Sequence, residues 1–394
     1  MATELQRVKL KPGRAKPLWY GHPWVYSEAV ERADQITPGD EVQIVDHDGR
    51  FIGRGFANPR SQIFVRIAER ADRPLDEGWL RSRLHAARSL RARLRLPSAE
   101  TDAYRLVNSE GDGLPGLIVD VFGDSAVVQL TTMGMKRREA EIFAAVTELL
   151  RPRTLYEASS GGAAQKVEGF VAQARVVAGE SRPEVPCREN GAALVVEPLV
   201  GQKTGWFLDQ RENRAFVAGL ARGARVLDLY TYAGGFALAA ALGGAAKITA
   251  VDVSPRALER AGKNFALNGI DPPELVEADV FRYLEAAPAG AFDLVICDPP
   301  KFARARKDLD AALRGYRHLN ALALAACADD ALLATASCSQ LVDDESFERM
   351  LAGAAKDAHR TLQVVHVAYQ AGDHTVPVAF PEGRYLKMFV CRVT

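Results

Sequence analysis

Apolar and polar positions follow two different periods in the first hundred residues. Short runs such as Glu41–Val45 and Phe51-Ile52 alternate with a period of two, and Asp48-Gly49 between them is typical of a β-hairpin. Residues 75–95 repeat an apolar side chain every three or four positions, which predicts a helix. We therefore expect a compact all-β domain up to about residue 70, followed by a helix.

The next stretch mixes both periods. A glycine-rich turn at Gly111–Gly116 precedes a predicted strand at Leu117–Val121, and a second strand is expected at Ala126–Thr131. A helix is predicted from about 136 to 150, and a pair of strands between 154 and 200. These elements indicate an α+β module with strands on both sides of a helix.

From about residue 202, predicted strands alternate with predicted helices. The expected strands are Arg225–Leu229, Lys247–Asp252, Glu274–Glu277, Phe292–Cys297, Ala331–Ser337, Leu362–Tyr369 and Leu386–Val393. The expected helices are 209–221, 235–243, 255–268, 280–287 and 308–328. This alternation predicts a mostly parallel sheet covered on both faces, an α/β fold. Seven strands that end in an antiparallel hairpin resemble the Rossmann-like layout of class I methyltransferases.

Length and composition are those of a multidomain globular protein. A chain of 394 residues predicts two or three domains, which we place at 1–72, 73–200 and 201–394. Apolar content of 48% and charged content of 25% are ordinary for a soluble protein. No run approaches the roughly 18 apolar residues of a membrane span, and Met1–Leu5 lacks a signal-peptide pattern. We expect a cytoplasmic protein with no membrane partner.

Cysteine spacing and local charge limit which metals and binding partners we expect. The five cysteines lie apart without metal-site spacing, which predicts reduced thiols and no metal. Basic and acidic residues balance at 50 each, but residues 51–100 hold 11 arginines against 5 acidic residues. Arginine donates bidentately to phosphate, so this segment is either part of an RNA-binding surface or a solvated helix face. Its most crowded arginines are Arg81, Arg83, Arg88, Arg91, Arg93 and Arg95.

A nucleotide-cofactor pattern opens the alternating region. Val226–Phe236 is an apolar strand, an acid and a glycine turn that leads into a helix. The spacing is not Gly-x-Gly-x-x-Gly, so a pyrophosphate cradle is not indicated. The run resembles the first motif of S-adenosylmethionine enzymes, which implies that cofactor. The contacts expected from this run are Asp228, Tyr230, Ala233 and Gly234.

Two further acids follow at strand ends. Asp252 could accept both ribose hydroxyls, with Val253 beside it, and Ser254 is a plausible cap for a helix that begins at Pro255. Asp279 could accept the adenine amino group, and Val280 could lend the ring a backbone donor. A lone acid at a strand end is commonly a helix cap, but three in order favour a cofactor site.

Five segments together resemble one family. Lys9–Gly13 and Gly21–Tyr26 resemble a PUA domain, a small β-barrel of RNA-modifying enzymes. Gln202–Arg211 resembles the segment that leads into the catalytic domain of 23S ribosomal RNA large-subunit methyltransferases. With Asp298–Phe302 and Ser337–Ser339 added, nearly the whole chain resembles the bacterial large-subunit rRNA cytosine carbon-5 methyltransferase family.

The resemblance implies partners and two more cofactor contacts. Phe207 would cover the cofactor and Arg211 would reach its carboxylate, although an ordinary helix start near Asp209 also explains this segment. The polynucleotide would be 23S rRNA or a large-subunit precursor, gripped by the β-barrel and the arginine-rich helix. A homodimer is implied only by the family.

The resemblance also implies a covalent mechanism. Carbon 5 of cytosine is a poor nucleophile until a thiolate adds to carbon 6, and Cys338 is placed as that nucleophile. Asp298 would bind the ring nitrogen and amino edge of cytosine, and Lys301 would neutralise Asp298 or contact RNA phosphate. The target base must leave any helix to reach the thiol.

One departure from related enzymes matters. Many RNA cytosine carbon-5 methyltransferases carry a second cysteine after the proline of this loop, where this chain has Pro300 and Lys301. Cys297 precedes the acid and by strand alternation points away from it, so we assign it to the core. The base that removes the carbon-5 proton is therefore unassigned, with a water or Asp298 as alternatives.

Two other functions remain open at this point. An rRNA guanine-nitrogen methyltransferase would use a similar acid-Pro-Pro loop but would need no thiol. A noncatalytic RNA-binding assembly factor would keep the fold without the chemistry. The joint presence of Asp228, Gly234, Asp252, Asp298 and Cys338 argues against the second alternative.

Overall fold

The structure is a computed structural model that describes residues 5–159, 167–201, 203–303 and 305–394. The chain divides into two compact units. The first comprises residues 1–188, 196–208 and 372–383, and the second comprises residues 189–195, 209–371 and 384–394. The three-domain division at residues 72 and 200 stays a prediction. Part of the region in which a strand pair was expected, 160–166, lies outside the described residues, as does Gln202.

A six-stranded sheet of order β2-β6-β5-β4-β1-β3 begins the first unit. Its elements are β1 (Gln6–Leu10), α1 (Lys16–Trp19), β2 (Trp24–Tyr26), β3 (Val30–Ala33), β4 (Glu41–Val45), β5 (Phe51–Ala57) and β6 (Ile63–Glu69). The antiparallel pair β4 and β5 confirms the predicted hairpin, with Gly49 at φ +85° in the turn. Alternate side chains such as Val8, Ile44 and Val65 fill its core.

A five-stranded sheet of order β11-β10-β9-β8-β7 follows in the same unit. Its strands are β7 (Ala103–Asn108), β8 (Leu117–Phe122), β9 (Ser125–Leu130), β10 (Thr154–Ala158) and β11 (Ala174–Gly179), and its helices are α2 (Glu77–Arg93), α3 (Met133–Lys136) and α4 (Glu139–Leu150). The predicted helix at 75–95 is confirmed. It begins after Asp76, whose carboxylate accepts the Trp79 N–H at 2.9 Å, and it buries Leu80 and Leu84 in the core.

Some arginines of α2 form ion pairs within the protein, among them Arg91 and Arg83. Arg91 is fully buried, and its guanidinium donates to Asp112 at 2.8 Å. Arg83 forms an ion pair with Glu69 at 3.1 Å. The hypothesis that this helix presents its arginines to RNA is therefore wrong for Arg91, because a buried, paired guanidinium holds protein elements together.

A two-stranded ribbon, β12 (Val185–Glu189) and β13 (Ala192–Val196), comes next along the chain. The second unit holds a seven-stranded sheet of order β16-β15-β14-β17-β18-β20-β19. The strands are β14 (Arg225–Leu229), β15 (Lys247–Asp252), β16 (Glu274–Glu277), β17 (Phe292–Cys297), β18 (Cys327–Ser337), β19 (Leu362–Tyr369) and β20 (Lys387–Val393). Only β20 runs antiparallel to its neighbours, which confirms the expected class I layout.

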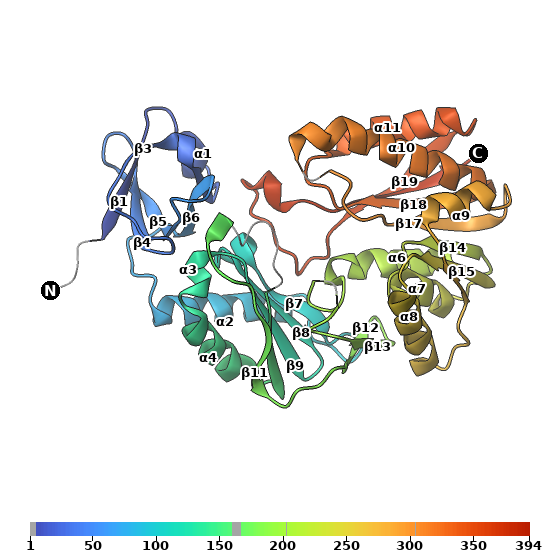
Figure 1. The fold of residues 1–394 in the computed structure, drawn as a ribbon, viewed down its shortest axis with the longest axis horizontal. Coiled ribbons are helices and arrows are strands. Elements are labelled where there is room, and N and C mark those ends of the chain that lie inside the picture. The colour runs from blue at the N-terminus through green and yellow to red at the C-terminus, as the bar shows by residue number, and fades with distance from the viewer. Residues whose placement is uncertain (1–4, 160–166, 202, 304) are drawn as a thin grey trace. The chain divides into compact units, whose positions relative to one another are not determined.

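Helices cover both faces of this sheet (Figure 1). The helices α6, α7 and α8 lie on one face, and α9, α10 and α11 lie on the other. Their bounds are α6 (Arg211–Leu220), α7 (Gly235–Leu242), α8 (Pro255–Leu267), α9 (Val280–Ala286), α10 (Leu309–Ala326) and α11 (Asp344–Asp357). The sequence pattern predicted all but α11. The apolar strands between these layers form the core, with Leu227, Val295 and Leu333 fully buried.

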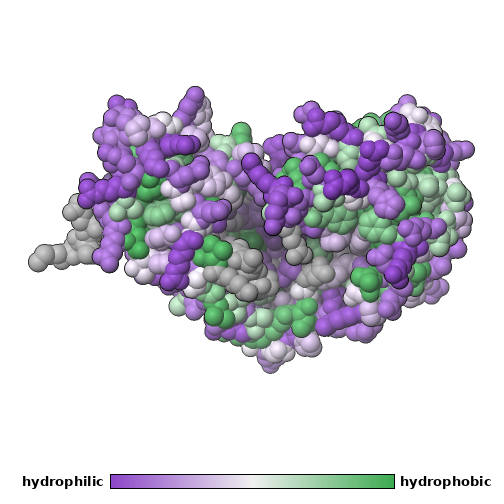
Figure 2. Space-filling view, turned by 45° about the horizontal axis from the view of Figure 1, so that its top comes forward, coloured by the Kyte–Doolittle hydropathy of each residue, from purple (hydrophilic) through white to green (hydrophobic). Residues whose placement is uncertain are grey.

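The surface is predominantly polar. Figure 2 shows hydrophilic residues over most of the face in view, with smaller hydrophobic areas between them. Within the ranges given above, none of the helices combines the length and hydrophobicity that a membrane crossing requires.

Candidate active site

Four parallel strands of the second unit end at one edge of the sheet. The register pairs Leu229 of β14 with both Val251 of β15 and Cys297 of β17, and it pairs Cys297 with Thr335 of β18. The segments that follow these strands carry most of the predicted site residues. Parallel α/β sheets bind ligands at this carboxyl edge, so the topology gathers the candidates there.

Asp228 organises the loop between β14 and α7. Its side chain is only 1% exposed. Oδ2 accepts the Thr231 hydroxyl at 2.6 Å and the Ala237 backbone N–H at 2.9 Å. Burial raises the pKa of Asp228 to about 7; these two hydrogen bonds oppose the rise, and the charges of Asp298 and Asp252 add to it. Asp228, which was predicted to contact the cofactor, therefore holds the β14–α7 loop in place through these hydrogen bonds.

The same loop holds three residues in left-handed backbone conformations. Gly234, which caps α7, has φ +78°, and a Cβ there would lie 2.9 Å from the Ala261 Cβ. Tyr230 and Tyr232 have φ +60° and +51°. A non-glycine residue in this conformation costs about 1–3 kcal/mol, and such residues gather at binding sites. The loop is thus held in a specific shape by its surroundings.

Asp252 lies at the end of β15. Its Oδ2 accepts the Tyr232 N–H and its Oδ1 accepts the Ser254 N–H, each at 2.9 Å. Each carboxylate oxygen keeps a second lone pair, which a ribose hydroxyl can use. Val253 is 69% exposed, an apolar surface next to that acid. Ser254 caps α8, whose first residue is Pro255, as predicted.

The third acid, Asp279, caps α9 by accepting the Arg282 N–H at 3.1 Å. Asp279 is therefore a helix cap, which was one of its two expected roles. Contact with a cofactor stays a proposal for Asp279 and for the buried Val280.

In the loop between β14 and α7, the carbonyl of Ala233 accepts the Asn264 side-chain amide at 3.0 Å. This contact orients the loop from α8.

Gln210 is the residue that positions Asp298. Its Nε2 donates to Asp298 Oδ2 at 2.9 Å, and its Oε1 accepts the Asn213 amide at 2.6 Å. Gln210 and Asn213 are both buried, so this chain of hydrogen bonds is protected from water.

Arg211, the first residue of α6, is also buried, and its Nη2 lies 3.5 Å from a carboxylate oxygen of Glu212. Phe207 belongs to the first unit, where its ring lies 4.5 Å from the Lys203 ammonium.

Cys338 differs from the other four cysteines, which are all buried. It is half-buried and directly follows β18. Cys297 is 0% exposed and belongs to the core, as predicted, and burial raises the pKa of its thiol. The two serines beside Cys338 are buried; the Ser337 hydroxyl donates to the Tyr316 hydroxyl at 3.1 Å and accepts the Ser339 N–H at 3.2 Å.

Lys301 does not take the first of its two expected roles. Its side chain is exposed, and within the described ranges no ion pair joins it to Asp298. Asp298 accepts a hydrogen bond from the neutral amide of Gln210. Contact of Lys301 with an RNA phosphate stays a prediction.

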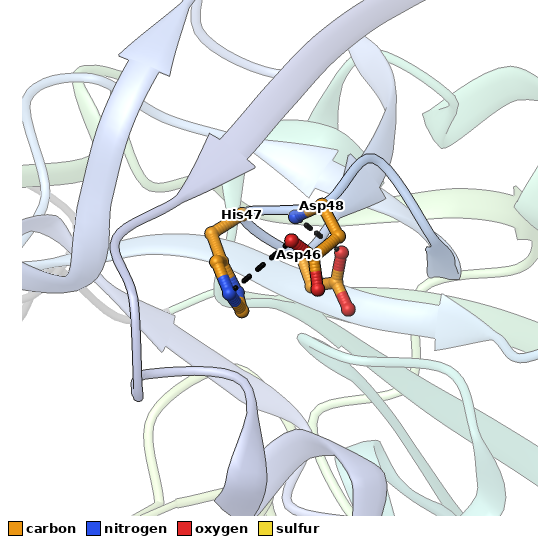
Figure 3. Close-up of side chains that lie close together, drawn as sticks. All are labelled: Asp46, His47 and Asp48. Atoms are coloured by element: carbon orange, nitrogen blue, oxygen red, sulfur yellow. Dashed lines mark hydrogen bonds and ion pairs between the residues drawn. The ribbon is translucent and has the colours of Figure 1, made fainter.

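One group of side chains in the part of the chain described here has the spacing of metal ligands. Asp46, His47 and Asp48 lie in the turn between β4 and β5 (Figure 3). Desolvation opposes ionisation of Asp46, but the backbone N–H groups of Arg50 and Asp48 outweigh it and lower its pKa. The carboxylate of Asp46 thus serves the hairpin turn, and we assign no metal to it.

Comparison with known proteins identifies the family. Residues 8–70 match the PUA-like domain family, and residues 156–360 match a family described as S-adenosylmethionine-dependent methyltransferase. Ribosomal RNA large subunit methyltransferase I of Alteromonas mediterranea is 39% identical over 98% of this chain and 99% of its own. The Klebsiella pneumoniae protein of that name is 38% identical over 98% of both chains. This chain belongs to the ribosomal RNA large subunit methyltransferase I family.

Solved structures share the fold of this family member. A SAM-dependent methyltransferase from Streptococcus mutans has a TM-score of 0.84 and 22% identity, over 98% of this chain and 99% of its own. Another methyltransferase, complexed with SAH, has a TM-score of 0.86 and 23% identity over the same shares. The expected fold class and the S-adenosylmethionine cofactor are confirmed.

The chemistry of the edge suits that cofactor. The Asp252 carboxylate offers acceptors for hydroxyl groups, and the exposed Val253 offers apolar contact for a base. When bound, S-adenosylmethionine supplies an electrophilic methyl group.

Three residues of the site escaped the sequence interpretation. Gln210 lay within a segment already singled out, but nothing in the sequence pairs it with Asp298. Asn264 looked like one polar position on an amphipathic helix. Lys387 carried a signal, because a charged residue opens a strand that is apolar from Met388 to Cys391, and it proves to be 3% exposed.

Asp228 generates a pH prediction. Its pKa is raised from an ordinary 3.8 to about 7, so its contribution to stability is fully present below about pH 3.8 and is lost as the pH rises through 7. Relative to Asp228→Asn, wild type should therefore lose stability between pH 4 and pH 7. Calorimetric unfolding of both proteins across this range tests it, and a difference that stays constant with pH would contradict the shift.

Gln210 generates a kinetic prediction. Gln210→Leu removes the hydrogen bond that orients Asp298, and we expect kcat for methyl transfer to fall about tenfold because misplaced groups lose rate. The Kd for S-adenosylmethionine should change less than about threefold. Gln363→Leu, on the exposed edge strand β19, is the matched control and should leave both unchanged. An unaltered kcat in Gln210→Leu would show that this bond is dispensable.

Proposed function

We propose that this enzyme methylates carbon 5 of a cytosine in 23S rRNA or a large-subunit precursor, through a covalent bond between Cys338 and carbon 6. The observation that carries the proposal is the pair of adjacent strand ends. The half-buried thiol of Cys338 follows β18, and Asp298 follows its parallel neighbour β17. A nucleophile and an acid beside a methyl-donor site are what carbon-5 chemistry requires.

In the proposed reaction, Cys338 and the base act in separate steps. The Cys338 thiolate forms a bond to carbon 6, and the electron pair of the carbon 5–carbon 6 bond becomes available at carbon 5. After carbon 5 is methylated, a base removes its proton. The carbon 6–sulfur bond then breaks, the double bond is restored and the thiolate returns. The identity of the base is open between a water and Asp298.

Asp298 is proposed to bind the ring nitrogen and amino edge of cytosine. Its Oδ2 accepts the Gln210 amide, which orients the carboxylate. Lys301, on the exposed part of the same loop, is proposed to contact RNA phosphate. The proposed cofactor contacts are Phe207, Arg211, Asp228, Tyr230, Ala233, Gly234, Asp252, Val253, Ser254, Asp279, Val280 and Asp298.

The substrate class is supported by the relatives and by the first unit. Relatives matched over their whole length are named for large-subunit ribosomal RNA. The PUA-like domain adds exposed aromatic residues, with Trp19 53% and Tyr20 76% exposed. Exposed aromatic rings stack on unpaired bases, which is how single-stranded RNA is held.

Replacement of the nucleophile tests the proposal. With labelled S-adenosylmethionine and 23S rRNA that lacks the modification, wild type should yield 5-methylcytidine on nucleoside analysis. Cys338→Ala should lower the rate by at least about 10³-fold, because the covalent route is closed.

The matched control is Cys297→Ala, which removes a core thiol on the neighbouring strand and should retain methyl transfer. Methylation of a guanine nitrogen that persists in Cys338→Ala would contradict the proposal and favour the enzyme class that needs no thiol. Absence of methyl transfer by a wild-type protein that binds S-adenosylmethionine and RNA would favour an assembly factor.

A further inference from the structure

Lys387 lies opposite the nucleophile's strand end. It begins β20, which runs antiparallel to β18, and the register pairs Lys387 with Ser337. Directly opposed residues of an antiparallel pair share one face of the sheet. Lys387 thus stands across from the residue that precedes Cys338.

The ammonium group is buried against the turn that carries Cys338. Lys387 is 3% exposed. Its Nζ donates to the carbonyl of Ser339 at 3.1 Å and to the carbonyl of Tyr385 at 3.4 Å. Among residues that the structure describes, none places a carboxylate within ion-pair distance of this ammonium. Its nearest polar neighbours are therefore neutral carbonyl groups.

A buried ammonium without a carboxylate partner is costly, because burial removes its hydration. Desolvation accordingly lowers the pKa of Lys387, and negative charge on Asp344, Cys338 and Asp343 opposes that fall. The Ser339 carbonyl that binds this ammonium belongs to the residue directly after Cys338, so the two charges act on each other. The reciprocal effect on the thiol must have the same sign, since a cation favours a thiolate.

We propose that the Lys387 ammonium stabilises the thiolate of Cys338, which makes Lys387 a positioning residue for the covalent step. The role in catalysis rests on the proposed function, whereas the effect on the thiol does not. Two carbonyl bonds fix the ammonium beside the Cys338–Ser339 turn. These bonds hold a positive charge next to the turn that carries the nucleophile.

Other charged and titratable groups lie near the same turn. Asp343 and Asp344 begin α11, where Asp343 caps the helix and Asp344 accepts the Tyr369 hydroxyl at 2.6 Å. Asp343 is exposed, so water screens its charge, while Lys387 acts through the protein interior. Tyr316 of α10 also interacts with Cys338, but burial raises the pKa of its phenol to about 12, which leaves it neutral at pH 7.

Alkylation by iodoacetamide measures the thiol directly and needs no RNA. We expect the Cys338 thiol of wild type to be half-ionised below about pH 8.5, the ordinary value for a cysteine. Lys387→Met keeps the length of the side chain and removes its charge. It should move the half-ionisation point upward and slow alkylation at pH 7 by about tenfold. Cys338→Ala gives the background from the four buried thiols.

Lys356→Met is the matched control, since Lys356 is an exposed lysine at the end of α11 whose loss should leave the titration unchanged. S-adenosylmethionine binding establishes that each variant is folded. If Lys387→Met does not fold, the wild-type titration decides alone, because a half-ionisation point at or above pH 8.5 overturns the proposal. An identical pH profile in wild type and Lys387→Met overturns it equally.

The two proposals fail separately. A shifted thiol in wild type together with guanine methylation would overturn the proposed function and leave the coupling of Lys387 to Cys338 standing. 5-Methylcytidine as the product together with an unshifted thiol would leave the proposed function standing and overturn the role of Lys387.

Discussion

The pairing of β17 with β18 is the constraint on which the rest of the site depends. Both strands are parallel and buried, and the register that joins Cys297 to Thr335 brings the two strand ends to one edge of the sheet. A slip of one residue would turn every side chain of a strand to the opposite face. The apolar side chains on both faces of these strands prevent such a slip, because it would repack the core. Core packing therefore sets the relative positions of Asp298 and Cys338.

Around this edge, polar side chains hold the backbone in place. Asp228 accepts two hydrogen bonds within the β14–α7 loop, Asp252 accepts two backbone N–H groups, and Gln210 orients Asp298. Each of these bonds fixes a group that would otherwise adopt several conformations in water. Preorganisation of this kind is how a site places a methyl acceptor and donor without reorganising during the reaction. The strained loop at Tyr230 and Tyr232 is consistent with that interpretation.

The sequence predicted the catalytic sheet almost to the residue, for a physical reason. Buried parallel strands read as continuous apolar runs, so β14, β15 and β17 begin and end where the pattern indicated. The more exposed edge strands β16 and β19 also have the expected bounds. β18 begins earlier than the expected Ala331, because it continues through an irregularity at Asp330, whose φ is +64°. Acidic residues in that position looked like a turn.

The pattern of apolar and polar residues could not predict contacts between residues that are distant in the sequence. The bond from Gln210 to Asp298 joins the residue before α6 to the loop after β17 and depends on the assembled sheet. The arginines of α2 show a similar limit: composition suggested either a surface for phosphate or a solvated helix face, and it did not indicate that Arg91 is buried against Asp112. Composition reports which groups are available, and only packing decides which of them reach solvent.

The most direct test of the account is covalent trapping. Wild type and Cys338→Ala are incubated with S-adenosylmethionine and a 23S rRNA transcript that contains 5-fluorocytosine, and denaturing gels are used to detect a protein–RNA adduct. Fluorine at carbon 5 cannot leave as a proton does, so the bond between Cys338 and carbon 6 should persist in wild type and be absent from the variant. Methyl transfer to natural RNA by a wild-type enzyme that forms no adduct with this transcript would contradict the covalent mechanism.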